Sequence, residues 1–235
     1  NKEKKKDILE AFEEEVNTFA KAVEKINSKE GKQKVEAAVE SYTLNNINLK
    51  INSGETVGVI GATGSSKTTL INLIPRLYDA TKGKVLVGGY DVKDYTLKNL
   101  RDSVAVVLQK NVLFSGSIKD NLKWGNKDAN ANDLVEVCQI ADADEFINQK
   151  PDKYYSELGQ GGVNVSGGQK QRLTIARALL KDPKILILDD SMSAVDTKTD
   201  ANIRARLKEY KPNITKIIIW KNMTAYVLEI NIFII

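Results

Sequence analysis

The pattern of hydrophobic and polar positions along the chain predicts an α/β fold. Four short aliphatic runs have the composition of strands, at residues 56–60, 104–108, 184–188 and 215–219. The run at 184–188 is continuous, which is typical of a central parallel strand covered on both faces. Apolar residues at helical spacing predict helices at 68–77, 130–147 and 167–180.

Turn signals flank the first of these strands and predict an antiparallel β lead-in. Residues 47–51 are expected to form a strand that joins the first one around Ser53-Gly54. Residues 84–87 are expected to form another strand, which ends at the Gly88-Gly89 turn.

The amino-terminal residues predict an appendage to the main domain. Between residues 7 and 26, apolar side chains from Phe12 to Ile26 fall at spacings of four and three, which predicts one amphipathic helix. Residues 28–34 are typical of a linker. We therefore divide the chain into an appendage with its linker, residues 1–34, and a main domain, residues 35–235.

The segment Gly61-Ala62-Thr63-Gly64-Ser65-Ser66-Lys67-Thr68 differs at one position from the pattern G-x-x-x-x-G-K-[ST] of a phosphate-binding loop. It lies between a predicted strand and a predicted helix, as that pattern requires. The first amides of a helix are unpaired and carry the positive end of its dipole, so they can surround phosphate oxygens. Lys67 would reach the β and γ phosphates, and the Thr68 hydroxyl would bind Mg²⁺. The candidate nucleotide-binding residues of this loop are Gly61, Thr63, Gly64, Ser65, Ser66, Lys67, Thr68 and Thr69. A surface turn beside a solvated lysine is the alternative interpretation.

The departure from the pattern is Ser66, which stands where the pattern has glycine. Glycine serves where φ is positive or where backbone approaches a ligand closely. If φ at residue 66 is positive, the serine costs about 1 kcal/mol. We expect weaker nucleotide binding rather than its loss.

Two carboxylates end the buried run at 184–188. In a parallel sheet, the carboxyl ends of the strands face one crevice, so Asp189 and Asp190 are expected near the phosphate loop. Asp189 is the candidate Mg²⁺ ligand, and Asp190 would point at the attacking water. The alternative is that both residues only begin a polar turn toward Thr197.

These motifs, in this order, make residues 40–220 resemble the nucleotide-binding domain of an exporter-type ATP-binding cassette (ABC) transporter. The set comprises Tyr42, the phosphate loop, Gln109, the signature Val165-Ser166-Gly167-Gly168-Gln169, Asp189-Asp190 and Ser193-Ala194-Val195-Asp196. The exporter type is indicated by residues 113–122 and by Glu157 to Gly162, which look like the segment that contacts the membrane domain. The resemblance implies a P-loop NTPase core with the antiparallel β lead-in and an inserted helical subdomain at about residues 110–180.

The resemblance also implies roles for individual residues. Tyr42 would stack on adenine, and Gln109 would contact Mg²⁺ and the nucleophilic water. Ser166, Gly167, Gly168 and Gln169 would open a helix toward the γ-phosphate of ATP bound to a second nucleotide-binding domain, in a homodimer or a heterodimer. A plain helix N-cap is the alternative interpretation of Ser166. The implied cofactors are ATP and Mg²⁺, and the implied partner is the transmembrane domain of an exporter.

Three departures from the family pattern bear on ATP hydrolysis. Besides Ser66, the family's usual catalytic glutamate is Asp190, which is one methylene shorter. Trp220-Lys221-Asn222 stand where a small residue, the switch histidine and an arginine usually sit, and the chain has no histidine. Low ATPase activity is therefore expected. Two accounts stay open: an ATP-binding half-site that completes a partner's active site, or a hydrolysis-impaired, decayed copy with a structural role.

Composition bears on the location of the chain and on which other classes of protein it could belong to. Net charge is +4, and no run of 18 apolar residues occurs, so no membrane-spanning helix is expected. The resemblance implies a peripheral domain at the cytoplasmic face of the cell membrane. The basic cluster is confined to Lys2, Lys4, Lys5 and Lys6. Without a basic stripe, a DNA-repair ATPase of the same superfamily is the weaker alternative and no nucleic-acid partner is expected. The single Cys138 cannot form an internal disulfide, and its context predicts a buried helical position.

Overall fold

The computed structural model describes Ser28, residues 42–110, 112–189, 195–210 and 212–220, and the backbone of residues 231–234. The chain divides into two compact units, residues 1–48 and 49–235. The amphipathic helix predicted at 7–26 lies outside the described residues, as does the predicted linker apart from Ser28. Every helix and strand that the structure describes belongs to the second unit.

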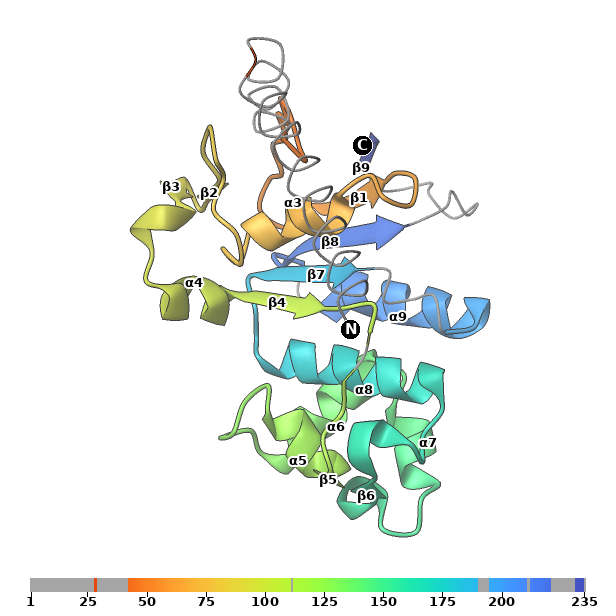
Figure 1. Ribbon diagram of the computed structural model, residues 1–235. Helices are drawn as coiled ribbons and strands as arrows, with labels where there is room; N and C mark the ends of the chain where they lie inside the picture. The colour runs from red at the N-terminus through yellow and green to blue at the C-terminus, as the bar shows by residue number, and fades with distance from the viewer. Residues whose placement is uncertain are drawn as a thin grey trace, which may run out of the picture. The chain divides into compact units, whose positions relative to one another are not determined.

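A five-stranded sheet forms the centre of the second unit, among the residues that the structure describes (Figure 1). All neighbouring strands are parallel. Across the sheet, the order is β4 (Val104–Val107), β7 (Ile185–Asp189), β8 (Thr215–Trp220), β1 (Thr56–Ile60) and β9 (Asn231–Ile234). The predicted α/β fold is confirmed, and four of these strands lie within one or two residues of the aliphatic runs that predicted them.

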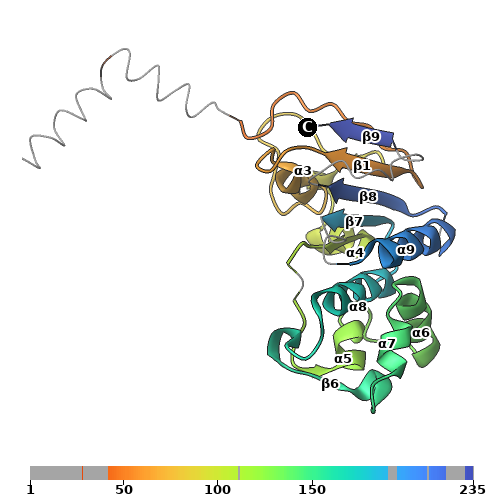
Figure 2. The same ribbon diagram turned by 90° about the vertical axis from the view of Figure 1, so that its right-hand side faces the viewer.

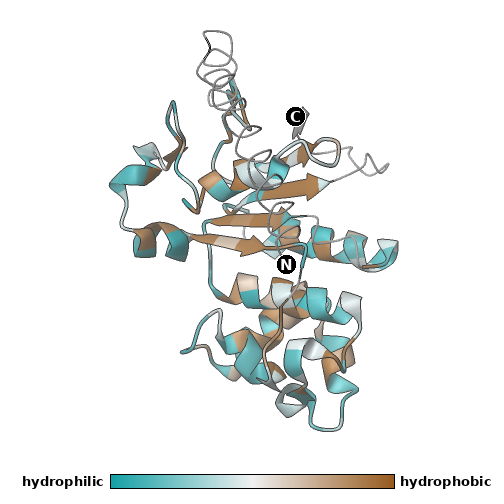
Figure 3. Ribbon diagram, viewed as in Figure 1, coloured by the Kyte–Doolittle hydropathy of each residue, from teal (hydrophilic) through white to brown (hydrophobic). Residues whose placement is uncertain are grey.

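Helices cover both faces of this sheet (Figure 2). On one face, Ile71 of α3 (Lys67–Leu73) packs with Val59, Ile187 and Ile219 of the sheet. The opposite face packs against α8 (Gly167–Leu180) and α9 (Thr197–Tyr210). Because both faces are covered, β1, β4, β7 and β8 are largely hydrophobic, and Figure 3 shows them mostly in brown.

A helical part precedes α8 along the chain and packs against it. The contacts of α8 with α5 (Ile118–Lys123) and α6 (Ala131–Ile140) continue the larger hydrophobic core, which includes the buried Leu122 and Cys138. The other short elements are η1 (Val92–Asp94), α4 (Leu97–Ser103), β5 (Gly116–Ser117), α7 (Asp144–Asn148), η2 (Lys153–Tyr155), β6 (Glu157–Leu158) and η3 (Gln160–Gly162). The predicted domain bounds at residues 34 and 35, and those of the helical subdomain at 110–180, stay predictions.

The predicted strand at residues 47–51 is wrong, because these residues adopt no regular structure. A strand needs a neighbour for its backbone N–H and C=O groups. Both edges of β1 are already paired, with β8 on one side and β9 on the other. The hairpin predicted at Gly88-Gly89 does form, between β2 (Leu86–Val87) and β3 (Tyr90–Asp91), with positive φ at both glycines.

Two predicted helices are shorter than expected. The helix predicted at 68–77 ends at Leu73, because Pro75 cannot continue it and restricts the residue before it. The helix predicted at 130–147 is broken into α6 and α7 at Asp142, whose φ is 56°. Aspartate tolerates this left-handed conformation better than most residues, so the break has a local cause.

Cys138 provides a test of this packing. Burial raises the pKa of its thiol to about 12, and only the thiolate reacts readily with disulfide reagents. At pH 8, the native chain should therefore react with a disulfide reagent more than about a hundredfold more slowly than the urea-unfolded chain. The stability contributed by keeping the thiol neutral is present below pH 9.0, the unfolded value, and falls as the pH rises toward 12. Fast, complete labelling of the folded chain would contradict the buried position.

Candidate nucleotide site

The phosphate loop connects β1 to α3. Residues 62–64 are exposed, and the amide of Ser65 donates to the carbonyl of Ala62 at 3.1 Å, which closes a tight turn. Ser66 is the N-cap of α3, with φ 63° and ψ 23°, and its side chain makes no capping hydrogen bond. The conditional expectation for Ser66 is therefore met, since the residue occupies the left-handed conformation that favours glycine.

Lys67 points back into the loop rather than into solvent. Its Nζ atom donates to the carbonyl oxygens of Gly61 at 2.5 Å and Ala62 at 2.8 Å, and to Ser65 Oγ at 3.2 Å. Only 7% of the residue is exposed. These bonds hold the ammonium group at the centre of the loop, next to the unpaired amides of the first turn of α3.

The loop meets the acidic strand end through one hydrogen bond. Thr68 Oγ1 donates to Asp189 Oδ2 at 3.0 Å, across 121 residues of sequence. Asp189 is the last residue of β7 and is 6% exposed. The structure thus brings together two of the three residues that the sequence proposed for Mg²⁺.

Four further residues of the motif set are Gln109, Tyr42, Asp190 and Asp196. Gln109 is exposed and lies two residues beyond the end of β4, the strand adjacent to β7. Tyr42 belongs to the first compact unit. Asp190 lies outside the described residues. Asp196 accepts a hydrogen bond from the amide of Thr199 at 3.0 Å, and this bonding at the start of α9 holds the pKa of its carboxyl below the usual range.

The signature residues form the amino-terminal end of α8. Ser166 is the N-cap: its Oγ accepts from the amide of Gln169, and Gln169 Oε1 accepts from the amide of Ser166. This capping box leaves the amides of Gly167, which is exposed, and of Gly168, which is half-buried, as first-turn donors.

The direction of α8 places this end at the carboxyl edge of the strands, where the phosphate loop also lies. At the opposite end of α8, Lys181 donates to the carbonyl oxygens of Arg101 and Val104 at the start of β4. The helix therefore runs antiparallel to β4, and its amino-terminal end points the same way as the carboxyl ends of the strands (Figure 1).

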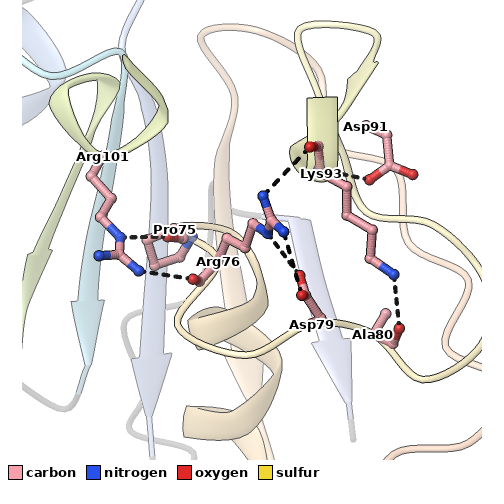
Figure 4. A network of polar contacts seen from close by, with 7 residues as sticks. All are labelled: Pro75, Arg76, Asp79, Ala80, Asp91, Lys93 and Arg101. Atoms are coloured by element: carbon pink, nitrogen blue, oxygen red, sulfur yellow. Dashed lines mark hydrogen bonds and ion pairs between the residues drawn. The ribbon is translucent and has the colours of Figure 1, made fainter. Parts of the chain in front are cut away.

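A polar network that the sequence did not reveal supports the far end of α3 (Figure 4). Arg101 of α4 donates to the carbonyl oxygens of Pro75 at 3.2 Å and Arg76 at 3.0 Å. Arg76, which has a φ of 53°, binds Asp79 at 2.8 Å. Lys93 donates to the carbonyl of Ala80 at 3.3 Å. These bonds fix the turn after α3, so the helix is anchored at the end opposite the phosphate loop.

A family model described as ABC transporter matches residues 44–193. This chain belongs to the ABC transporter family. The matched residues include the phosphate loop, the signature and the acidic strand end, and domains of this family bind ATP, in general together with Mg²⁺.

Known ABC exporters are similar to this chain in sequence and in structure. Two multidrug export ATP-binding/permease proteins of Staphylococcus aureus, from strains bovine RF122 / ET3-1 and NCTC 8325 / PS 47, are 44% and 43% identical to it over 180 residues. The alignment covers 77% of this chain but only 31% of each relative. A bacterial Atm1-family ABC exporter with ATP bound has a similar fold, with a TM-score of 0.80 and 31% identity over 83% of this chain and 35% of that one.

These likenesses make the chain an exporter-type ABC nucleotide-binding domain, and they favour neither the DNA-repair class nor a decayed subunit. The P-loop NTPase fold expected from the motifs is confirmed. Among the described residues, no helix is both long enough and apolar enough to cross a membrane.

Ser66 generates a prediction for this ABC domain. The change Ser66→Gly should raise the free energy of unfolding by about 1 kcal/mol, because glycine has no Cβ to strain in the left-handed conformation. It should also tighten ATP binding, since the backbone can then approach the phosphates more closely. Urea unfolding and isothermal titration measure the two effects. The control Ser66→Ala keeps the Cβ and should gain neither; an unchanged Ser66→Gly variant would show that the serine is tolerated.

Proposed function

We propose that this chain binds Mg-ATP between its phosphate loop and the signature helix of a second nucleotide-binding domain, and that this binding drives export through a membrane domain. The observation that carries the proposal is the bond between Thr68 and Asp189. It joins the start of α3 to the end of β7 beside the enclosed ammonium group of Lys67. A glycine-containing surface turn would have no reason to hold a buried carboxylate and a buried lysine at one edge of a parallel sheet.

The donor set of this edge fits Mg²⁺ bound with a triphosphate. A hydroxyl and a carboxylate are hard oxygen ligands, which Mg²⁺ prefers, and it usually takes its remaining ligands from phosphates and water. Among the described residues, no cluster of three acidic, histidine or cysteine side chains could hold a metal by itself. That agrees with a metal that binds together with nucleotide. When bound, Mg²⁺ would neutralise charge on the β and γ phosphates.

Lys67 and the loop amides would bind the phosphates. The bonds of Lys67 to Gly61 and Ala62 position its Nζ atom inside the loop before nucleotide arrives, so little side-chain entropy remains to be lost. The Thr68 hydroxyl would turn from Asp189 toward the metal. Tyr42 would stack on adenine, as the resemblance implies.

A second domain would complete the site. The first-turn amides of Gly167 and Gly168 are suited to an anion, because a helix N-terminus carries unpaired donors and a positive dipole end. They point toward the carboxyl edge of the strands, where the phosphate loop lies. Two domains that face each other with these edges would therefore each offer a signature helix to the other's ATP. The partner is a second copy or a non-identical domain.

Hydrolysis is expected to be slow in this arrangement. Gln109 and Asp190 would contact the attacking water, but an aspartate reaches less far than the family's glutamate, and the chain has no histidine for the γ-phosphate. In a heterodimer, the intact signature would still complete the partner's site. The chain would then act at the cytoplasmic face of the membrane, where exporter domains of this family work.

An apolar groove offers a docking site for the membrane domain. It has a volume of about 320 Å³ and lies beside the edge strand β4 and α8. Phe114 and the exposed Trp124 stack at 4.8 Å on its rim, and Arg177 and Lys181 add two cations. The permease part of the relatives lies outside the 31% that this chain matches. A permease segment with apolar side chains and a carboxylate fits this lining.

Titration with Mg-ATP tests the nucleotide site. The folded chain should bind Mg-ATP, and Lys67→Ala should weaken binding by at least about tenfold, because a charge-assisted hydrogen bond to phosphate is lost. The change Asp189→Asn should remove the dependence of affinity on Mg²⁺ and leave Mg²⁺-free binding intact. Gln109→Ala changes an exposed side chain two residues beyond the end of β4 and is expected to affect affinity less than either change. A parent chain that binds no ATP would refute the proposal.

Hydrogen exchange tests the groove. If this chain replaces the matching segment of a Staphylococcus aureus relative, amides of residues 112–125 should exchange more slowly than in the isolated chain, because a permease segment covers them. Trp124→Ala should remove much of that protection. The control Leu86→Ala alters another exposed apolar side chain, on β2, and should leave it unchanged. Equal exchange in the chimera and in the isolated chain would exclude this docking site.

A further inference from the structure

Trp220 is the residue for which the sequence offered no role, and the structure places it between two elements of the nucleotide site. It is the last residue of β8, and its indole lies on the α9 face of the sheet, packed against the larger hydrophobic core. In register, Trp220 pairs with Ile60 of β1, and Gly61 of the phosphate loop follows directly. The backbone of Trp220 is therefore level with the last residue before the loop, and its indole reaches back along β1 to Gly58.

The edge of the indole, at Cζ3, lies against the backbone of Gly58. A Cβ atom at residue 58 would lie 2.4 Å from Cζ3 of the ring, so the indole could not keep this position beside a larger residue. Gly58 interrupts an otherwise β-branched run in β1, and glycine within a strand marks a close approach of another group. The glycine and the tryptophan thus form a matched pair across two neighbouring strands.

The indole is also capped by a cation from α9. The guanidinium carbon of Arg204 lies 4.9 Å from the centre of the Trp220 ring. Arg204 is itself fixed by Asp200, one helical turn earlier, through a bond of 2.7 Å from Nε to Oδ1. Both side chains of this ion pair are less than a quarter exposed. Gly58, Trp220, Arg204 and Asp200, hereafter the Trp220 stack, join β1 and β8 to α9.

We propose that Trp220 is a positioning residue for the nucleotide site, which it serves through this stack. Its indole sets the position of the end of β1, and thereby of Gly61 and the loop carbonyls that hold Lys67. The inference rests on the proposed function, because its consequence is a change in ATP affinity. It differs from a role in folding alone, since a merely structural contact would change stability without changing the affinity of the folded chain.

Isothermal titration with Mg-ATP, at a temperature where every variant is fully folded, tests the inference. Arg204→Ala should weaken binding about three- to tenfold, because a partly buried cation–π contact is lost. Arg204→Lys should restore most of the affinity, since an ammonium group can also face the ring. Trp220→Ala should weaken binding at least as much as Arg204→Ala, and adding Arg204→Ala to it should have no further effect.

Controls separate the possible outcomes. Ile147→Val, in the buried core of α7, should lower the melting temperature without changing ATP affinity. If Trp220→Ala does not fold, the partly exposed Arg204 still provides the test. Parent-like affinity in Arg204→Ala and Trp220→Ala would overturn this inference and leave the proposed function standing. A parent chain that binds no ATP would overturn both.

Discussion

The parallel pairing of β8 with both β1 and β7 is the constraint on which the nucleotide site depends. Ile219 of β8 pairs with Val59 of β1 on one side and with Asp189 of β7 on the other, so β7 ends level with the last but one residue of β1. The phosphate loop leaves β1 just beyond that level. The Thr68–Asp189 bond closes the remaining distance, and neither residue would meet the other if the register slipped by one, because each strand would turn its side chains to the opposite face.

Around this edge, the chain tolerates local strain and unusual packing. Ser66 holds a left-handed conformation without a capping bond, and Trp220 fills space above Gly58 that a small residue would leave open. The surroundings hold these positions firmly: α3 is fixed at its far end by Arg101, and the end of β8 is fixed by the Trp220 stack. Rigid support of this kind is what a site needs if a few amides are to fit three phosphates.

The helical part that contains α5, α6 and α7 is bonded to α8 and α9 through one residue. Asp142, in the turn between α6 and α7, accepts from Arg206 of α9 at 2.8 Å, and its backbone carbonyl accepts from Arg172 of α8 at 2.6 Å. The signature helix and α9 therefore share one acidic partner. These bonds attach the turn between α6 and α7 to both α8 and α9.

The sequence alone determined the elements whose signals are local. The aliphatic run of β7, the start and end of α8 and the phosphate-loop spacing were predicted closely, because composition and spacing encode them directly. Tertiary structure decided the rest. Residues 47–51 form no strand because β9, from the end of the chain, occupies the edge they needed, and Ser66 is strained because of the conformation the loop imposes. Tertiary structure also chose the contact partners of Trp220, Asp142 and Arg101, which lie 16 to 162 residues away in sequence. Contacts across such separations depend on how the elements pack, and no local sequence pattern encodes that packing.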